Sequence, residues 1–153
     1  MSDRIEIVEG EVFTDGRGRI HSLNSFHFDG VRRCYVIHHP DASVVRGWHG
    51  HRYERKWFYC TKGRFTLALV KVDNWENPSP GLRAEVFHLD EMHSRLVCVP
   101  AGYANCLKAE EPGSIMTVYS DKTLDEAVHD SWRYDKTMWI DLSTDNNSKQ
   151  KEK

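Results

Sequence analysis

The chain has 153 residues and a formal net charge of -2, and its acidic and basic side chains are interspersed. This length suits one domain with a hydrophobic core and is too short for two, so we expect a single domain over residues 1–142. The charge gives no sign of a nucleic-acid groove or a membrane-binding face, and no apolar run approaches the span of a bilayer. Because the first residues also lack the pattern of a signal peptide, we expect a cytoplasmic protein.

Short segments rich in valine, isoleucine and aromatic residues recur along the chain and are separated by turn residues. This pattern is typical of an all-β protein, and strands at such spacing favour a sandwich or a barrel. We expect strands at residues 5–8, 19–26, 31–38, 44–48, 56–61, 65–72, 83–89, 95–99, 104–108 and 114–119. Residues 65–70 are apolar on both strand faces, which indicates that one face lines a cavity while the other meets a second sheet or subunit. We therefore expect a homodimer.

The pattern changes after Asp121. Residues 124–133 are polar and indicate a short helix. Five apolar residues that follow are expected to close over the body: Trp132, Tyr134, Met138, Trp139 and Ile140. The last stretch, residues 143–153, contains no apolar residue, and we expect it to form a disordered tail.

The most informative segment is residues 46–51, which read Arg-Gly-Trp-His-Gly-His. His49 and His51 are two positions apart, so on an extended strand they point to the same side. Lys56 begins the next expected strand, and a cation can therefore converge with two imidazoles on a small polar ligand. The alternative is that both histidines are solvated edge residues and that the lysine extends into solvent.

Four motifs in a fixed order give the chain a family resemblance: residues 13–18, residues 45–49, Lys56 followed by Gly63, and residues 100–105. Together they resemble the cupin-fold 3,5-epimerases that act on dTDP-4-keto-6-deoxyhexoses, such as the dTDP-4-dehydrorhamnose 3,5-epimerases, over about residues 11–141. A second set of segments resembles the sugar-nucleotide 3,4-ketoisomerases: residues 31–37, 49–51, 124–126 and 133–135. The resemblance implies a double-stranded β-helix, the cupin jelly roll, with a short C-terminal helical segment. It also implies a dimer with a dTDP-sugar in the mouth of the barrel.

The resemblance assigns three catalytic residues. A 4-keto group makes the neighbouring C3 and C5 protons acidic, so an enzyme needs a base beside the carbon and a positive group beside the ketone oxygen. By resemblance His49 is the general base, Lys56 stabilises the enolate, and Asp135 orients the histidine. No metal and no cofactor are implied.

Further side chains are expected to contact the sugar nucleotide. Guanidinium groups suit diphosphate oxygens, since they present paired donors in one plane. The expected substrate-binding residues are Arg46, His51, Arg17, Arg33, Tyr35, Asn105 and Tyr119. Asn105 stands where the epimerase pattern has a histidine. The epimerases also carry a tyrosine acid near position 124 that this chain lacks, and Tyr119, Asp125 or a water is a candidate substitute for it.

The missing acid leaves the reaction open. Epimerisation at C3 or C5 needs a proton removed from one face and returned to the other, whereas a 3,4-ketoisomerase can move a proton along one face of an enediol. We therefore expect an epimerase, with a ketoisomerase as the alternative. Two further alternatives are a non-catalytic sugar-nucleotide-binding cupin and a metal-dependent cupin that uses His49, His51 and Glu54.

Overall fold

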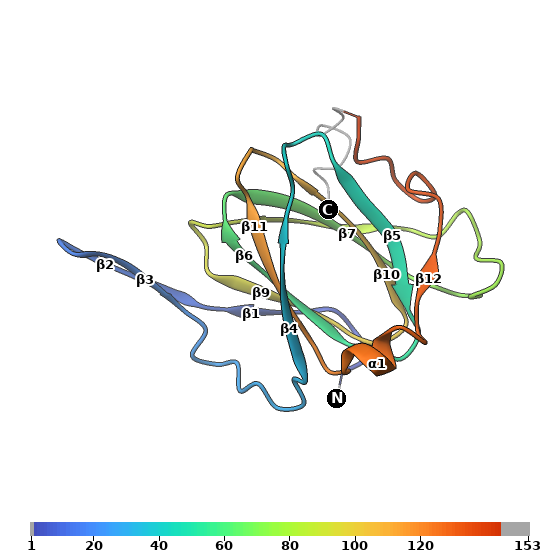
Figure 1. The fold of residues 1–153 in the computed structure, drawn as a ribbon, viewed down its shortest axis with the longest axis horizontal. Helices are drawn as coiled ribbons and strands as arrows, with labels where there is room; N and C mark the ends of the chain where they lie inside the picture. The colour runs from blue at the N-terminus through green and yellow to red at the C-terminus, as the bar shows by residue number, and fades with distance from the viewer. Residues whose placement is uncertain (1, 145–153) are drawn as a thin grey trace.

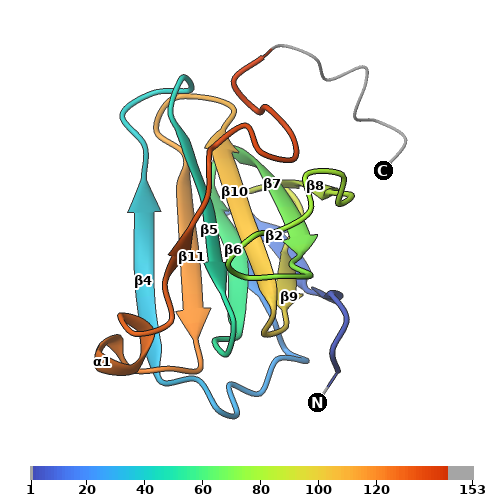
Figure 2. The same cartoon turned by 90° about the vertical axis from the view of Figure 1, so that its right-hand side faces the viewer.

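The computed structural model describes residues 2–144, and its chain forms two facing antiparallel sheets and one separate hairpin (Figures 1 and 2). The first sheet has the order β1-β9-β6-β11-β4, and the second has the order β12-β5-β10-β7-β8. The strands are β1 (Glu6–Glu9), β2 (Glu11–Asp15), β3 (Gly18–Ser22), β4 (Arg33–His38), β5 (Val45–His51), β6 (Lys56–Lys62), β7 (Arg64–Lys71), β8 (Glu85–Asp90), β9 (Arg95–Val99), β10 (Tyr103–Ala109), β11 (Ile115–Ser120) and β12 (Trp132–Arg133). The prediction of a β protein with a short C-terminal helical segment is confirmed.

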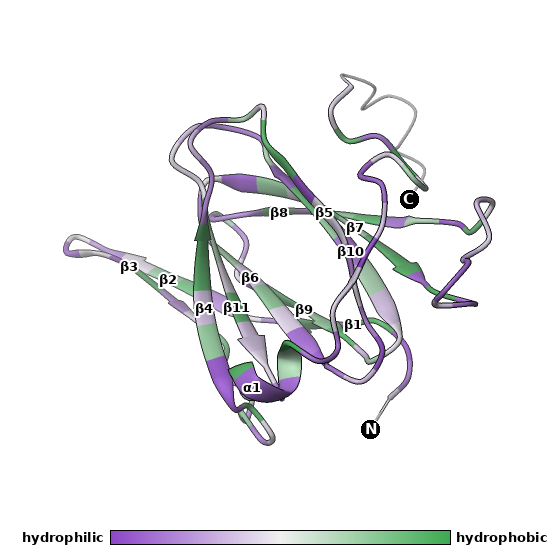
Figure 3. Cartoon of the chain, turned by 45° about the vertical axis from the view of Figure 1, so that its right-hand side comes forward, coloured by the Kyte–Doolittle hydropathy of each residue, from purple (hydrophilic) through white to green (hydrophobic). Residues whose placement is uncertain are grey.

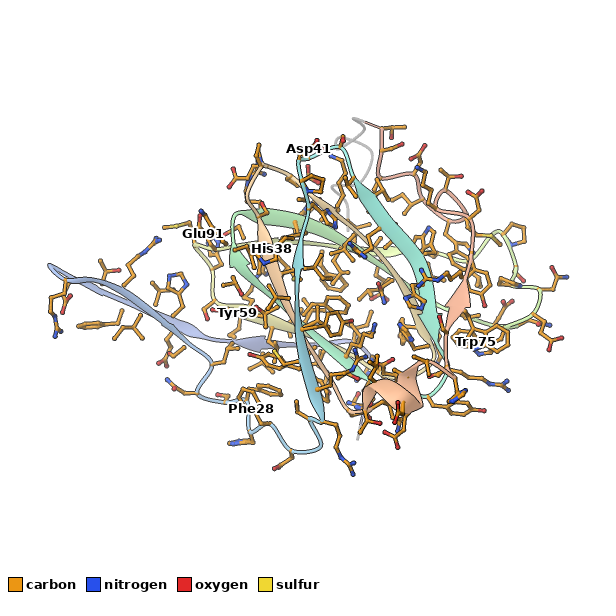
Figure 4. All side chains as sticks on the ribbon, in the orientation of Figure 1. Phe28, His38, Asp41, Tyr59, Trp75 and Glu91 are labelled. Atoms are coloured by element: carbon orange, nitrogen blue, oxygen red, sulfur yellow. The ribbon has the colours of Figure 1, made fainter. Side chains whose placement is uncertain are left out.

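The hydrophobic core lies between the two sheets, because inward residues alternate with outward ones along each strand. On β11 the buried positions are Met116, Val118 and Ser120, every second residue. Figure 3 shows hydrophobic residues recurring along the strands of both sheets, and Figure 4 shows side chains filling the space between them. Burying a large apolar side chain such as Phe58 or Leu107, each 1% exposed, stabilises the fold by roughly 1.5–3 kcal/mol.

The outer face of the second sheet is covered by the end of the described chain. Tyr134, Met138, Trp139 and Ile140 pack on a buried cluster that includes Trp48. The fifth residue of the expected apolar group, Trp132, also packs, since its ring centroid lies 5.6 Å from that of Trp75. This cover explains why β7 and β10 are apolar on both faces.

The predicted helix over residues 124–133 is too long. Helix α1 spans only Leu124–Ala127, and it begins at a capping box in which Thr123 and Glu126 satisfy each other's backbone N–H groups. The chain then forms β12, which pairs antiparallel with β5. Edge pairing with β5 therefore ends the helical segment. No helix within residues 2–144 has the length and apolar character needed to cross a membrane. Most of the predicted tail, residues 145–153, lies outside the described residues.

A projecting hairpin replaces the single strand predicted at residues 19–26. Strands β2 and β3 pair only with each other and extend away from the body (Figure 1). Their apolar residues are left uncovered, with Phe13 56% and Ile20 62% exposed. An isolated two-stranded hairpin is marginally stable in water, so a surface that covered these residues would stabilise this one.

Candidate active site

A cavity of about 620 Å³ lies between the two sheets, with α1 among its walls. Strands β5 and β10 of the second sheet contribute Arg46, His49, His51 and Asn105. Strands β4 and β6 of the first sheet contribute Arg33, Tyr35 and Lys56. Seven of the ten site residues expected from the sequence therefore line one cavity, and they come from both of its walls.

A bulge in β5 brings Arg46 to the same side as the histidines. Arg46 and His49 are three positions apart, so a regular strand would turn them to opposite faces. The pairing with β10 shifts at this point, since Asn105 lies opposite His49 while the next residue of β10 lies opposite Gly47. Trp48 is the extra residue and points into the outer cluster. Gly47 has φ 140° and a Cβ there would lie 2.6 Å from the Asn105 carbonyl oxygen, so this position requires glycine.

His51 is held as a neutral imidazole with a defined acceptor nitrogen. Its Nδ1 lies 3.0 Å from the backbone carbonyl oxygen of Asp130. A carbonyl can only accept, so Nδ1 carries the proton and Nε2 keeps its lone pair. Nε2 is buried and has no hydrogen-bond partner within the described residues. Burial, and then the charge of Lys56, lowers the pKa of His51 to about 3.

His49 lies beside His51, with 4.3 Å between their ring centroids. Its Nε2 lies 2.7 Å from the Ser131 hydroxyl oxygen. Burial, and then the neighbouring His51, lowers the pKa of His49 to about 3. Both imidazoles are therefore uncharged near neutral pH, but His49 already uses one of its ring nitrogens in a bond with a side chain.

The opposite wall carries a cation and a phenol. Lys56 is only 7% exposed, and its Nζ lies 5.5 Å from the centre of the Tyr35 ring. Burial lowers the pKa of Lys56 to about 8, although the nearby Glu54 opposes this shift. Burial, and then the charge of Glu54, raises the pKa of Tyr35 to about 12. At neutral pH Lys56 is thus a cation that can release its proton, and Tyr35 is a neutral phenol.

The sequence analysis missed two residues that support this site. Glu54, which it considered only as a metal ligand, accepts hydrogen bonds from the Arg33 guanidinium at 3.1 Å and from the Ser120 hydroxyl. Asp130 was not considered, although its carboxylate accepts from the backbone N–H groups of residues 52–54 at 2.7–3.0 Å. The partners are some 76 to 78 positions away in the chain, so no local pattern marks the pairing.

Three expected site residues lie away from this cavity. Arg17 is at the tip of the hairpin, where it pairs with Asp15 at 2.6 Å and its side chain is 86% exposed. Tyr119 faces outward from β11 and packs in the cluster around Trp57, because the alternation along β11 turns Val118 and Ser120 inward. Asp135, expected to orient His49, instead accepts from the backbone N–H and hydroxyl of Thr137.

The metal set considered from the sequence is not assembled. Among residues 2–144, no group of three or more histidine, cysteine, aspartate or glutamate side chains is arranged to hold a metal ion. His51 directs its Nδ1 proton to a carbonyl, and Glu54 is engaged by Arg33 and Ser120.

Two facing antiparallel sheets with a cavity between them suit a jelly roll, and solved structures of cupin enzymes share this fold. The chain is similar to a histidine-to-asparagine mutant of the 3,4-ketoisomerase QdtA from Thermoanaerobacterium thermosaccharolyticum in complex with TDP-4-keto-6-deoxyglucose, with a TM-score of 0.68, 18% identity, and 88% of this chain and 90% of that chain covered. It is also similar to NovW, a 4-keto-6-deoxy sugar epimerase from Streptomyces spheroides, with a TM-score of 0.73, 19% identity, and coverage of 92% and 73%. The chain is likewise similar to the rmlC epimerase of Mycobacterium tuberculosis, with a TM-score of 0.70 and 18% identity. The match covers 94% of this chain and 81% of that chain.

The chain belongs to the FdtA family, described as WxcM-like, C-terminal, which matches residues 3–139. No curated protein sequence matches the chain. The resemblance seen in the motifs is confirmed, and so is the cupin jelly roll that it implied.

Proposed function

We propose that the protein is a cofactor-independent isomerase of a dTDP-4-keto-6-deoxyhexose in deoxysugar biosynthesis. The observation that carries the proposal is the pairing, across one cavity, of a neutral imidazole and a buried lysine. His51 presents an unpartnered Nε2, and Lys56 lies on the facing sheet with a lowered pKa. Removal of a proton next to a ketone needs such a base and such a donor.

His51 fits the role of the base better than His49, to which the resemblance assigned it. A general base must hold an unprotonated nitrogen toward its substrate, and the bond to Asp130 fixes that state for His51. The corresponding nitrogen of His49 is close to Ser131. We therefore assign proton abstraction to His51 and contact with the sugar to His49.

The favoured reaction is 3,4-ketoisomerisation. His51 takes the C3 proton while Lys56 protonates the ketone oxygen at C4, which gives an enediol. Return of the proton from His51 to C4, with loss of the O3 proton to Lys56, leaves the ketone at C3. One base on one face suffices for this transfer, and Tyr119, the expected substitute for an opposite acid, points out of the cavity.

Epimerisation at C3 or C5 is the second candidate reaction. The position and protonation state of Tyr35 favour it. Tyr35 belongs to β4 on the wall facing His51, and its raised pKa keeps the phenol protonated. A phenol in that place can return a proton to the face opposite the base. The two reactions differ in where the proton returns, so isotope labelling separates them.

The charges of the cavity suit a nucleoside diphosphate. Four cationic side chains line it, Arg33, Arg46, Lys56 and Arg133, against the single carboxylate of Glu54 among the described lining residues. Arginine pairs well with diphosphate oxygens, and the excess of positive charge attracts a doubly charged ligand. We propose that Arg46 binds the diphosphate and that Asn105 contacts the sugar.

We also propose a cytoplasmic homodimer in which the β2–β3 hairpin docks on the second copy. The exposed Phe13 and Ile20 require such a cover, and the hairpin extends away from its own body. Arg17 at its tip can then reach a ligand only in the cavity of the partner subunit. The double variant Phe13→Asp, Ile20→Asp should be a monomer by light scattering. A variant that remains a dimer would contradict docking through the hairpin.

An NMR time course in deuterated water with dTDP-4-keto-6-deoxyglucose tests the reaction. Ketoisomerisation predicts a carbonyl that moves to C3, whether His51 returns the original proton to C4 or a deuteron taken up from solvent. Epimerisation predicts deuterium at C3 or C5 with the carbonyl in place. Ligand binding with neither a migrated carbonyl nor deuterium uptake would refute both and favour a non-catalytic sugar-nucleotide-binding protein.

A further inference from the structure

Glu54 is a buried carboxylate that is only half satisfied. Its side chain has no exposure, and Oε2 accepts from Arg33 and Ser120. The other oxygen, Oε1, is buried without a hydrogen-bond partner within the described residues. A buried carboxylate is costly unless it is fully paired, so the unpaired oxygen calls for a role.

The unpaired oxygen lies beside the imidazole that the proposed reaction uses. Oε1 of Glu54 is 3.1 Å from Nδ1 of His51, whose proton is directed at the Asp130 carbonyl oxygen. While His51 is neutral, its Nδ1 proton is donated to the Asp130 carbonyl oxygen, and Oε1 of Glu54 has no donor within the described residues. When Nε2 takes a proton, Nδ1–H becomes a charged donor, and a carboxylate is then a better partner than a neutral carbonyl.

The other charges near His51 oppose its protonation. Lys56 from β6, Arg33 from β4 and Arg133 from β12 all act to lower its pKa, and His49 from β5 adds no negative charge. The carboxylate of Asp130 is occupied by three backbone N–H groups. Glu54 is therefore the acidic group, among the described residues that line the cavity, placed to balance an imidazolium.

We propose that Glu54 is the counter-charge that holds His51 while it carries the substrate proton. It is a positioning residue, since it acts through His51 and not on the substrate. Glu54 thus has the role, a carboxylate that orients the catalytic histidine, that the family resemblance assigned to Asp135. This inference rests on the proposed function, because it concerns the base of that same reaction.

Glu54→Gln and Glu54→Asp separate charge from shape. Glutamine keeps the size of the side chain and removes the charge, whereas aspartate keeps the charge and shortens the reach. If the charge matters, the Gln variant should lose about a hundred-fold in turnover, the lower end of what a positioned general base contributes, and the Asp variant should lose less. A purely structural role predicts the reverse order, since glutamine fills the site better.

The chain offers a matched control in Glu110. It also accepts from a hydroxyl, that of Thr66, and lies 3.5 Å from a cation, Lys108, but it is outside the cavity. Glu110→Gln should exchange the substrate proton at the wild-type rate. Affinity for dTDP, measured by calorimetry, should fall much less than turnover in Glu54→Gln.

A second measurement is independent of turnover. In ¹⁵N-histidine NMR spectra of the dTDP complex, loss of the neighbouring anion should make His51 protonate at a lower pH in Glu54→Gln than in the wild type. Wild-type turnover in Glu54→Gln, or an unchanged protonation pH of His51, would overturn the inference. If the Gln variant does not fold, the wild-type spectrum tests the inference instead. The resonance of the His51 Nδ1 proton should move far downfield when Nε2 is protonated, and an unchanged resonance would overturn the inference. A wild type that neither moves the carbonyl nor exchanges a substrate proton would refute the proposed function, while the NMR titration would still test Glu54.

Discussion

Replacement of His51 by asparagine separates the chemical role of this residue from its structural one. The asparagine amide can still donate to the Asp130 carbonyl oxygen that Nδ1 of His51 now uses. The contact between β5 and the segment after α1 is therefore kept, while the accepting Nε2 is removed. We expect a folded protein that binds dTDP and turns over slowly.

The size of the loss follows from the state of the imidazole. The low pKa of His51 keeps it unprotonated at neutral pH, so the whole enzyme population holds the competent base. Loss of a general base costs about a hundred-fold to ten-thousand-fold in rate. His49→Asn should cost less, because His49 shares its Nε2 with Ser131 and contacts the sugar in our assignment.

The assay is the rate at which the C3 proton of dTDP-4-keto-6-deoxyglucose is removed, followed by NMR in deuterated water, with dTDP affinity and melting temperature measured on the same variants. Slow exchange in His51→Asn with near-wild-type affinity supports the assignment. Should His51→Asn exchange the C3 proton at the wild-type rate while His49→Asn loses exchange, the base is His49, and the argument from the Asp130 bond is refuted.

Further outcomes follow from the same site. Lys56→Met should lower turnover about a hundred-fold to a thousand-fold with little change in dTDP affinity, since it removes the donor at the developing oxyanion; an equal loss of affinity would assign Lys56 to binding. In the wild type, kcat/KM should be lost as the pH rises through about 8, where Lys56 gives up its proton, and as it falls toward about 3, where His51 is protonated; activity that persists well above the upper limit would exclude Lys56 as the acid. Co-expression of Arg17→Ala with His51→Asn should give mixed dimers with about half of the wild-type activity, because one of the two sites then has both groups. Absence of such complementation, in dimers shown by mass to be mixed, would mean that Arg17 does not act in its partner's site. The free energy of unfolding should fall as the pH drops from about 6.5 toward 3, because His49 and His51 take up protons in the unfolded chain before they do so in the folded one; a His49→Asn, His51→Asn double variant with the same pH dependence would contradict this.

Strand positions and the site motif could be predicted from sequence because both depend on local patterns. Apolar alternation and turn residues located most strands, and the spacing of His49 and His51 placed them on one face. The match of residues 45–49 to a family motif placed Arg46 among the expected site residues, and it does line the cavity, although simple alternation would have turned it away. Only the bulge at Trp48 explains its position physically, and nothing in the chain's periodicity reveals that bulge.

Other features could not be predicted because they depend on distant contacts. The segment that follows α1 was expected to be helical, but pairing of β12 with β5 made it a strand. The resemblance placed the orienting carboxylate at Asp135, in a segment where the motifs match loosely. The structure instead has Glu54 and the Asp130 carbonyl beside His51.

The role of Asp130 links the closure of the fold to the state of the base. Its carboxylate binds the backbone of residues 52–54, which fixes the turn between β5 and β6 and so sets the place of Lys56 at the start of β6. Its carbonyl oxygen selects the tautomer of His51. Because one residue from the end of the domain performs both tasks, the two walls of the cavity acquire their working geometry only when the C-terminal segment docks on β5. Loss of the Asp130 carboxylate should therefore impair folding and proton transfer together, whereas His51→Asn and Lys56→Met should lower turnover in a protein that still folds at neutral pH.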